Sequence, residues 1–239
     1  MTQSKRSTPR LDEASVARMP LFDGADRAAL HAILESASIR RVGPGAVLFS
    51  EEDRASIFCL VVEGFVRLLR TTSDGEQVVV HHVAPGELFG IAVALESETF
   101  SVTAKAVCDC VVLSWPREAW PALTRAHPGL ARATRRTIGL RTRELQDKIV
   151  DMATLPVEQR IANALLRLAR QAGRETGSGA EIDFPLTRQD ISELTGANMH
   201  SVSRHMSSWQ KTGIVSSARR RIVIVRPDAL REVAQGRAA

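Results

Sequence analysis

The sequence has few of the features that mark secreted, disulfide-rich or membrane proteins. Three cysteines in 239 residues are too few for a disulfide framework, which fits a reducing compartment. No apolar run approaches the ~18 residues that span a bilayer. The first residues, MTQSKRSTPR, are polar and lack the apolar stretch of a signal peptide. We therefore expect a cytoplasmic protein with no membrane partner.

The sequence also lacks the side-chain patterns of catalysis. It contains no nucleophile–base arrangement, no phosphate-binding glycine loop and no His/Cys set with the spacing of metal ligands. We therefore predict a protein that is not an enzyme and holds no metal.

Charge is distributed unevenly along the chain. Residues 187–239 contain nine Lys or Arg against four Asp or Glu, a net charge of +5. Residues 21–116 contain seven basic against thirteen acidic residues, a net charge of −6. This asymmetry indicates that only the C-terminal segment meets a polyanion such as nucleic acid, although surface charge also varies by chance.

Residues 40–116 are typical of short β-strands. Runs rich in Val, Ile and Phe alternate with turn glycines, and SDGE at 73–76 is a strong hairpin turn because Asp-Gly supplies positive φ angles. The pattern predicts a small sandwich or barrel within a domain of residues 21–127, preceded by an N-terminal tail of residues 1–20.

Residues 128–153 are typical of one long helix with an apolar seam. The seam consists of Ala131, Ile138, Thr142, Leu145, Ile149 and Met152. Spacings of seven, four, three, four and three place these residues on one helix face. We also expect Glu144 and Lys148 to pair one turn apart. The helix either joins two copies of the chain or packs on its own domain.

Residues 154–239 predict a helix-turn-helix followed by a basic hairpin. The expected elements are a helix at 156–172, a flexible loop at 173–179, a short strand in EIDFPL, helices in TRQDISELT and NMHSVSRHMSSWQKTG, a hairpin in IVSSARRRIVIV and a closing helix in PDALREVA. Thr187 and Asp190 form a candidate capping box. Val202, Met206 and Trp209 lie four and three apart and should face the core, leaving a polar face for DNA.

The residues expected to contact DNA come from both helices and from the hairpin tip. They are Thr187, Arg188, Asn198, Met199, His200, Ser201, Ser203, Arg204, Lys211, Arg219, Arg220 and Arg221. Short polar groups and one arginine suit the major groove, while arginines at a hairpin tip suit phosphates.

The chain resembles the CRP/FNR superfamily of transcription regulators over nearly its whole length. The segments PGAVLFSEED, FCLVVEGFVRLL and PGELFG resemble its β-roll, and LTRQDISELTGANMHSVSRHMSSWQKTGIV resembles its winged helix. The resemblance implies an α+β fold with a cyclic-nucleotide-binding-like jelly roll, a long central dimerisation helix and a winged helix-turn-helix. It also implies a homodimeric activator that works with RNA polymerase.

The closing segment DALREVA resembles the FNR branch of the family. In that branch the positions of His200, Ser203 and Arg204 read Glu, Ser and Arg and contact a TTGA-type half-site. Two of the three match, so the resemblance implies an inverted repeat of double-stranded DNA with TTG-like half-sites.

The departures from the family concern the signal. Cyclic-AMP-binding members have a glutamate where this chain has Ile91, and an arginine near the position of Glu98. A carboxylate there would repel a phosphate, so we expect no cyclic AMP. The first cysteine is Cys59, so the N-terminal iron–sulfur ligands of the FNR proteins are missing. The resemblance then favours a type that responds to nitrogen oxides, sometimes through haem.

Two histidines and two cysteines are weak candidates for holding a cofactor. His81 and His82 should point to opposite faces of one strand, one as an ordinary histidine and the other as a possible haem or metal ligand. Cys108 and Cys110 should share one strand face as core cysteines or, alternatively, as a redox or metal pair. The alternative function is a haem- or small-ligand-binding signalling module whose helix-turn-helix contacts proteins.

Overall fold

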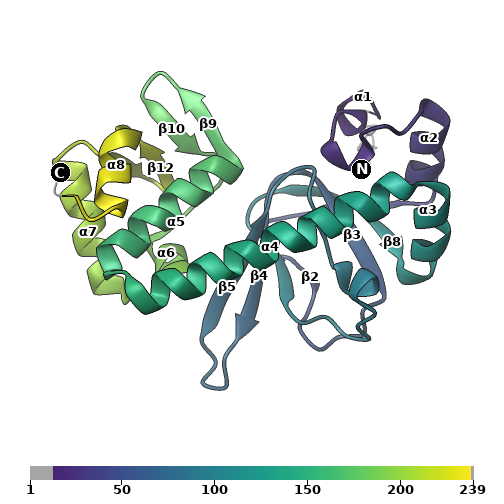
Figure 1. Ribbon diagram of the computed structural model, residues 1–239, viewed down its shortest axis with the longest axis horizontal. Helices are drawn as coiled ribbons and strands as arrows, with labels where there is room; N and C mark the ends of the chain where they lie inside the picture. The colour runs from purple at the N-terminus through teal and green to yellow at the C-terminus, as the bar shows by residue number, and fades with distance from the viewer. Residues whose placement is uncertain (1–12, 238–239) are drawn as a thin grey trace, which may run out of the picture.

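The structure, a computed structural model, describes residues 13–237 and has the predicted α+β architecture. Figure 1 shows a β-roll and a smaller helical lobe, with one long helix running along the roll into the lobe. None of the helices in the described part of the chain is both long and apolar enough to cross a membrane.

The N-terminal lobe begins with helices that cover the roll. They are α1 (Glu13–Ala17), the 3-10 helix η1 (Pro20–Phe22) and α2 (Arg27–Glu35). Residues 1–12 of the predicted tail lie outside the described residues. Residues 13–20, also predicted as tail, instead form α1 and the start of η1, and Val16 is fully buried in the apolar core beneath them.

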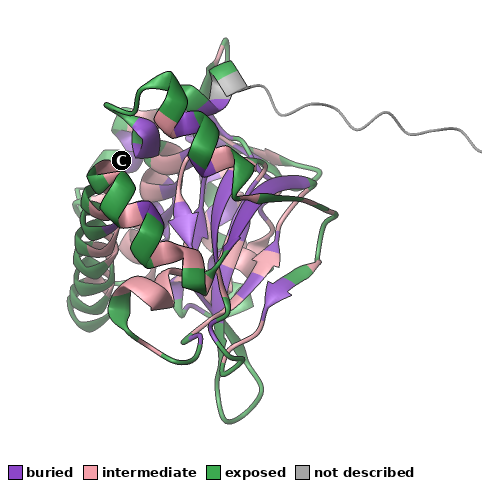
Figure 2. Cartoon of the chain, turned by 90° about the vertical axis from the view of Figure 1, so that its right-hand side faces the viewer, coloured by how far each residue is buried: buried purple, intermediate pink, exposed green. Residues whose placement is uncertain are grey.

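Two four-stranded antiparallel sheets form the roll, which confirms the predicted sandwich. One sheet has the order β1–β8–β3–β6, with bounds Ser38–Val42, Cys110–Pro116, Ile57–Glu63 and Leu88–Phe89. The other has the order β2–β7–β4–β5, with bounds Val47–Phe49, Thr103–Ala106, Val66–Thr71 and Gln77–Val83. Buried residues gather on these strands (Figure 2). The β3–β8 sheet is buried on both faces, by the second sheet and by the N-terminal helices.

The long helix α4 extends from Pro128 to Thr154 and follows α3 (Trp120–Ala126). Near its start, Leu130 and Thr134 are buried against the N-terminal lobe. Further along, Leu145, Ile149 and Met152 are 42%, 67% and 56% exposed. The helix therefore has a packed side and an apolar side open to solvent.

A winged helix-turn-helix follows α4. Its elements are α5 (Val157–Ala172), β9 (Gly173–Thr176), β10 (Gly179–Ile182), α6 (Arg188–Thr195), α7 (Met199–Lys211), β11 (Val215–Ala218), β12 (Arg221–Ile224) and α8 (Pro227–Ala234). The expected flexible loop at 173–179 is wrong in part, because residues 173–176 pair with β10 as a strand. That strand completes a sheet in the order β11–β12–β10–β9.

Candidate nucleic-acid interface

A complete capping box fixes the start of α6. The backbone N–H of Asp190 donates to Thr187 Oγ1 at 3.1 Å, and that of Thr187 donates to Asp190 Oδ2 at 2.8 Å. Such a box satisfies two helix-end donors and stabilises the helix by about 1 kcal/mol. The predicted role of Thr187 as a cap is thus confirmed.

The turn between α6 and α7 depends on a glycine and an asparagine. Gly196 ends α6 with φ at 63°, a left-handed conformation that glycine adopts without steric cost. Asn198 then caps α7 by accepting the N–H of Ser201 at 2.8 Å. Because the Asn198 side chain accepts this N–H, its structural role is to cap and orient α7.

Helix α7 separates apolar from polar side chains as predicted. Val202 and Met206 have no exposed surface and Trp209 is 3% exposed. His200 and Arg204 are exposed, and Ser203 is partly exposed beside them. The helix therefore packs on its domain through one face and offers a short polar face, with one guanidinium, to a ligand. Met199 at its first turn is 40% exposed.

Arg188 is held between the two helices. Its guanidinium donates to Ser207 Oγ at 3.3 Å and to Gln210 Oε1 at 3.4 Å, and Gln210 Nε2 donates to the carbonyl of Ser217 in β11. These bonds join α6, α7 and the wing. The sequence pattern did not identify Ser207 or Gln210, whose part is apparent only from the packing.

The hairpin between β11 and β12 presents all three of its arginines to solvent. Arg219 and Arg220 occupy its two-residue turn with φ at 48° and 68°, and both are exposed. Arg221 differs, because its guanidinium binds Glu181, which is only 6% exposed. Arg221 is nevertheless exposed like its two neighbours, so the contact of all three arginines with DNA stays a prediction.

The helix-turn-helix is bound directly to the β-roll. Arg67 Nη1 in β4 donates to Asp190 Oδ1 at 2.8 Å, so the carboxylate that caps α6 also receives a cation from the roll. Phe184 packs against Phe65 and His82 of the roll, with ring centroids 4.8 and 4.9 Å apart. A change in the roll would thus reach the first helix of the DNA-reading pair.

His81 and His82 face different surroundings, as expected for adjacent strand positions. His81 lies between two carboxylates, with ring nitrogens 3.2 Å from Glu87 Oε2 and 3.3 Å from Glu144 Oε2. His82 is stacked on Phe184, and burial lowers its pKa to about 3, so its ring is neutral at pH 7.

These contacts do not fit a haem. Both nitrogens of His81 are engaged, and His82 adjoins a cavity of about 90 Å³. Organic cofactors occupy pockets of roughly 300 Å³ or more. Within residues 13–237 no group of three His, Cys, Asp or Glu is placed to hold a metal ion.

The expected ion pair between Glu144 and Lys148 is replaced by contacts with other elements. Glu144 binds His81 and also accepts from Gln171 Nε2 of α5 at 2.9 Å. Lys148 Nζ donates to the carbonyls of Val79 and Val80 at 3.3 and 3.0 Å. Both side chains are thus used to fasten α4 to its surroundings.

Two of the three cysteines are buried core residues as predicted, whereas Cys108 is not. Cys59 and Cys110 are buried, and burial raises their thiol pKa values to about 12 and 11. Cys108 is half-buried and lies in a bend before β8, so the two thiols do not share a strand face as expected. Cys110 Sγ donates to the carbonyls of Phe65 and Cys108, which ties this bend to β4.

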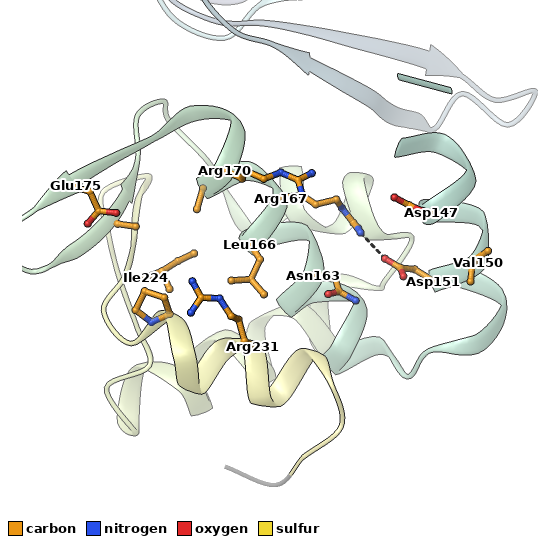
Figure 3. Close-up of a pocket in the computed structure, with 13 residues that line it drawn as sticks. Asp147, Val150, Asp151, Asn163, Leu166, Arg167, Arg170, Glu175, Ile224 and Arg231 are labelled. Carbon is orange, nitrogen blue, oxygen red and sulfur yellow. Dashed lines mark hydrogen bonds and ion pairs between the residues drawn. The ribbon is translucent and has the colours of Figure 1, made fainter. Parts of the chain in front are cut away.

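A groove of about 650 Å³ lies between α4, α5, α8 and the β9–β10 hairpin (Figure 3). Its rim carries both signs of charge, and Arg167 points across it to Asp151, with Nη1 2.6 Å from Oδ2. This pair joins α5 to the end of α4, so the groove marks the junction at which the helix-turn-helix departs from the long helix.

The two positions that depart from cyclic-nucleotide-binding members lie beyond β6. Ile91 begins the 3-10 helix η2 (Ile91–Leu95), and Glu98 is exposed in the segment that follows. Gly90 precedes η2 with φ at 66°, and a side chain there would come within 3.1 Å of the Phe49 ring.

Two family models match separate segments of the chain. Residues 39–127 match the family described as Cyclic nucleotide-binding domain, and residues 159–233 match Crp-like helix-turn-helix domain. The chain is 29% identical over 217 residues to the Cyclic AMP receptor protein of Thermus thermophilus, covering 91% of this chain and 97% of that one. It is 27% identical to the Nitrogen fixation regulation protein FixK of Azorhizobium caulinodans, covering 75% and 71%.

A solved structure shares the fold. The structure of FixK2 from Bradyrhizobium japonicum superposes with a TM-score of 0.73 at 23% identity, covering 85% of this chain and 98% of that chain.

Proposed function

Because the chain belongs to the CRP/FNR family of DNA-binding transcription regulators, we propose that it acts as a homodimer on an inverted-repeat DNA site under control of a signal received by the β-roll. The observation that carries the proposal is the outer face of α7. There His200, Ser203 and Arg204 stand beside one another, opposite a fully buried apolar face.

The three side chains have distinct roles in reading bases. Arg204 carries a planar fork of donors that fits the O6 and N7 atoms of one guanine. Ser203 contacts a neighbouring base or phosphate. His200 has a ring that can donate, unlike a carboxylate, so it does not require the amino group of a cytosine. The half-sites therefore keep a TTG-like core and differ from the FNR sequence next to it.

Phosphate contacts set the position of the helix on the duplex. Arg219 and Arg220 at the wing tip and Lys211 at the end of α7 are exposed cations. These contacts hold the reading face in register without selecting a sequence.

Dimerisation follows from the apolar flank of α4. The seam of Ile138, Thr142, Leu145, Ile149 and Met152 would pair with its copy about a two-fold axis and remove exposed apolar surface from water. Two recognition helices would then lie about one helical turn of DNA, roughly 34 Å, apart. Bound at a promoter, the dimer acts as an activator through RNA polymerase.

The signal is neither cyclic AMP nor an FNR-type iron–sulfur cluster. Ile91 cannot accept a ribose hydroxyl, and the carboxylate of Glu98 disfavours a cyclic phosphate. A haem-linked nitrogen-oxide signal is not part of the proposal, since His81 and His82 offer no fitting axial ligand.

Selection from a random double-stranded DNA library tests the proposal. The wild-type protein should enrich an inverted repeat with a TTG-like core, and His200→Glu should enrich half-sites that add a cytosine contact. The reading of His200 is wrong if both proteins select the same half-site. Failure of the wild type to enrich any site would favour a helix-turn-helix that contacts proteins instead.

A further inference from the structure

A small, partly open cavity lies where the three parts of the molecule meet. The cavity of about 90 Å³ is bounded by β4 and β5 of the roll, by α4, and by α5 and α6 of the DNA-binding domain. The sensor, the long helix and the helix-turn-helix thus surround one point. A ligand in this cavity would therefore contact the β-roll, α4 and the helix-turn-helix.

The walls of this cavity carry more positive than negative charge. Arg141 and Lys148 both line it from α4. Arg141 has one long ion pair, Nη2 to Glu87 Oε2 at 3.9 Å, and donates to the carbonyl of Leu88. Lys148 donates to carbonyls of β5 and forms no ion pair within 4 Å among the described residues. Glu144, the acid in the wall, is already bound by His81 and Gln171. Arg167, also in the wall, is neutralised by Asp151.

Two buried nitrogens in the same wall have no hydrogen-bond partner among the described residues. They are Arg141 Nε and His82 Nδ1. An unmade hydrogen bond of a buried polar group costs about 1–3 kcal/mol, and more when the group is charged. The arginine N–H can only donate, and the neutral imidazole of His82 donates in one of its tautomers. Arg141 Nε therefore needs an acceptor, and His82 can donate to the same acceptor when Nδ1 carries its proton.

Burial also penalises the cations themselves. Desolvation lowers the pKa of Lys148 to about 8 and lowers the pKa of Arg141 from its usual value. A buried cation is stabilised by an opposite charge close by, because desolvation otherwise disfavours its charged form. An anion in the cavity would supply that charge to both side chains.

We propose that this cavity binds a small oxyanion or carboxylate, which joins the β-roll, α4 and the DNA-binding domain. The size fits an ion of a few heavy atoms, since about 90 Å³ is the space of roughly three water molecules. Access is available from a groove of about 550 Å³ along α4, which shares His81, Arg141, Glu144 and Gln171 with the cavity. The binding is inferred from the lining of the cavity, and its effect on DNA rests on the proposed function.

The position of the cavity would let a bound anion influence DNA binding. Lys148 and Arg141 belong to α4, the helix that we assign to dimerisation. His82 stacks on Phe184 of the DNA-binding domain. Arg67, which pairs with His82 across the sheet, binds Asp190 in the capping box of α6. A ligand that favours this docked arrangement changes DNA affinity, and DNA must change its affinity for the ligand by the same factor.

Isothermal titration calorimetry on the full-length protein tests the binding. Acetate, nitrate and phosphate are titrated at constant ionic strength, with acetamide as the neutral isostere of acetate. We expect saturable binding of at least one anion and none of acetamide. His82→Phe keeps a ring on Phe184, and Lys148→Met keeps most of the side-chain length. Each should weaken binding at least tenfold, whereas Arg125→Met, an exposed charge on α3, should leave it unchanged.

The outcomes separate this inference from the proposed function. The anion site is refuted if no anion binds saturably, as for a cavity that holds water only, or if His82→Phe binds as tightly as the wild type. If Lys148→Met fails to fold, the result for His82→Phe alone decides whether the anion site exists. Fluorescence anisotropy with the selected DNA is measured in parallel, and a saturating anion should change its Kd at least fivefold. An anion that binds without changing the Kd refutes the coupling. A protein that binds the anion but no specific DNA refutes the proposed function and leaves the site standing.

Discussion

Helices α7 and α4 distribute their side chains in opposite ways. In α7 the apolar residues Val202, Met206 and Trp209 are buried and the polar residues face solvent. In α4 the charged residues Arg141 and Lys148 are turned toward the roll and the helix-turn-helix, while large apolar residues are exposed. Helix α7 is complete within one chain, whereas α4 lacks a covering for its apolar side.

The difference shows which helix depends on partners. A helix in a globular domain normally buries its apolar stripe, so an exposed stripe marks a contact surface. The charged side of α4 is also unusual, because a buried cation requires a partner to offset its desolvation. One helix thus presents a surface suited to a second copy of the chain and a cavity suited to an anion.

Ile149→Arg should have the largest effect, because it alters the surface that we assign to a second copy of the chain. Ile149 is 67% exposed, so the monomer should tolerate the change. In the dimer, two arginines would meet near the two-fold axis, and like charges in contact cost several kcal/mol. We expect dimer affinity to fall by about 5 kcal/mol, more than a thousandfold, and specific DNA binding to be lost.

Sedimentation velocity measures this effect directly. Leu140→Arg is the matched control, since Leu140 is also exposed but lies two residues from Ile138 and hence on the other side of α4. The control should remain a dimer. An intact dimer in Ile149→Arg would contradict the seam.

Met206→Ala tests α7, the helix whose apolar residues are buried within one chain. Met206 is fully buried between α7 and the rest of its domain, so its truncation leaves a cavity. We expect the free energy of unfolding to fall by about 3 kcal/mol, as is usual for buried Met→Ala changes. Urea denaturation followed by circular dichroism measures it. Ser208→Ala, on the exposed side of the same helix, should change stability by less than about 0.5 kcal/mol.

The sequence predicts α7 well because every signal within it agrees. The period of Val202, Met206 and Trp209, the cap at Asn198 and Gly196 before it all indicate the same helix and the same faces. The β-roll is likewise predicted from alternating apolar runs and turn glycines. The strand at 173–176 escaped prediction because GRETGSG is polar and rich in glycine, so only pairing with β10 makes it a strand.

The junction could not be predicted, because its residues are far apart in the chain. Arg67 and Asp190 are 123 residues apart, and nothing local to either indicates the other. Glu144 and Lys148 have the spacing of an ion pair, yet tertiary contacts with His81 and with β5 carbonyls prevail. Arg221 is equivalent to its two neighbours in sequence, and only its pairing with Glu181 across the sheet sets it apart.

Arg204→Ala should have an intermediate effect, since it removes one side chain from the polar side of α7. Loss of a bidentate contact to guanine costs about 1–3 kcal/mol and removes discrimination at that base pair. Fluorescence anisotropy with the selected site and with a site altered at the guanine measures both effects. The assignment of Arg204 is wrong if its alanine variant still prefers guanine as strongly as the wild type does.

Arg220 should show the smallest effect, because a phosphate interaction at the wing tip carries no sequence information. Arg220→Ala should weaken binding to all sequences alike and make the slope of log K against log salt shallower by about 0.9 for each phosphate that is no longer neutralised. Since Arg220 has φ at 68°, Arg220→Gly removes the same charge without backbone strain and should give the same slope. Arg125→Ala, a charge change on α3 away from the wing, should leave the slope unaltered. Equal slopes for wild type and both Arg220 variants would show that Arg220 does not neutralise a phosphate, and the wing contact would then have to come from Arg219.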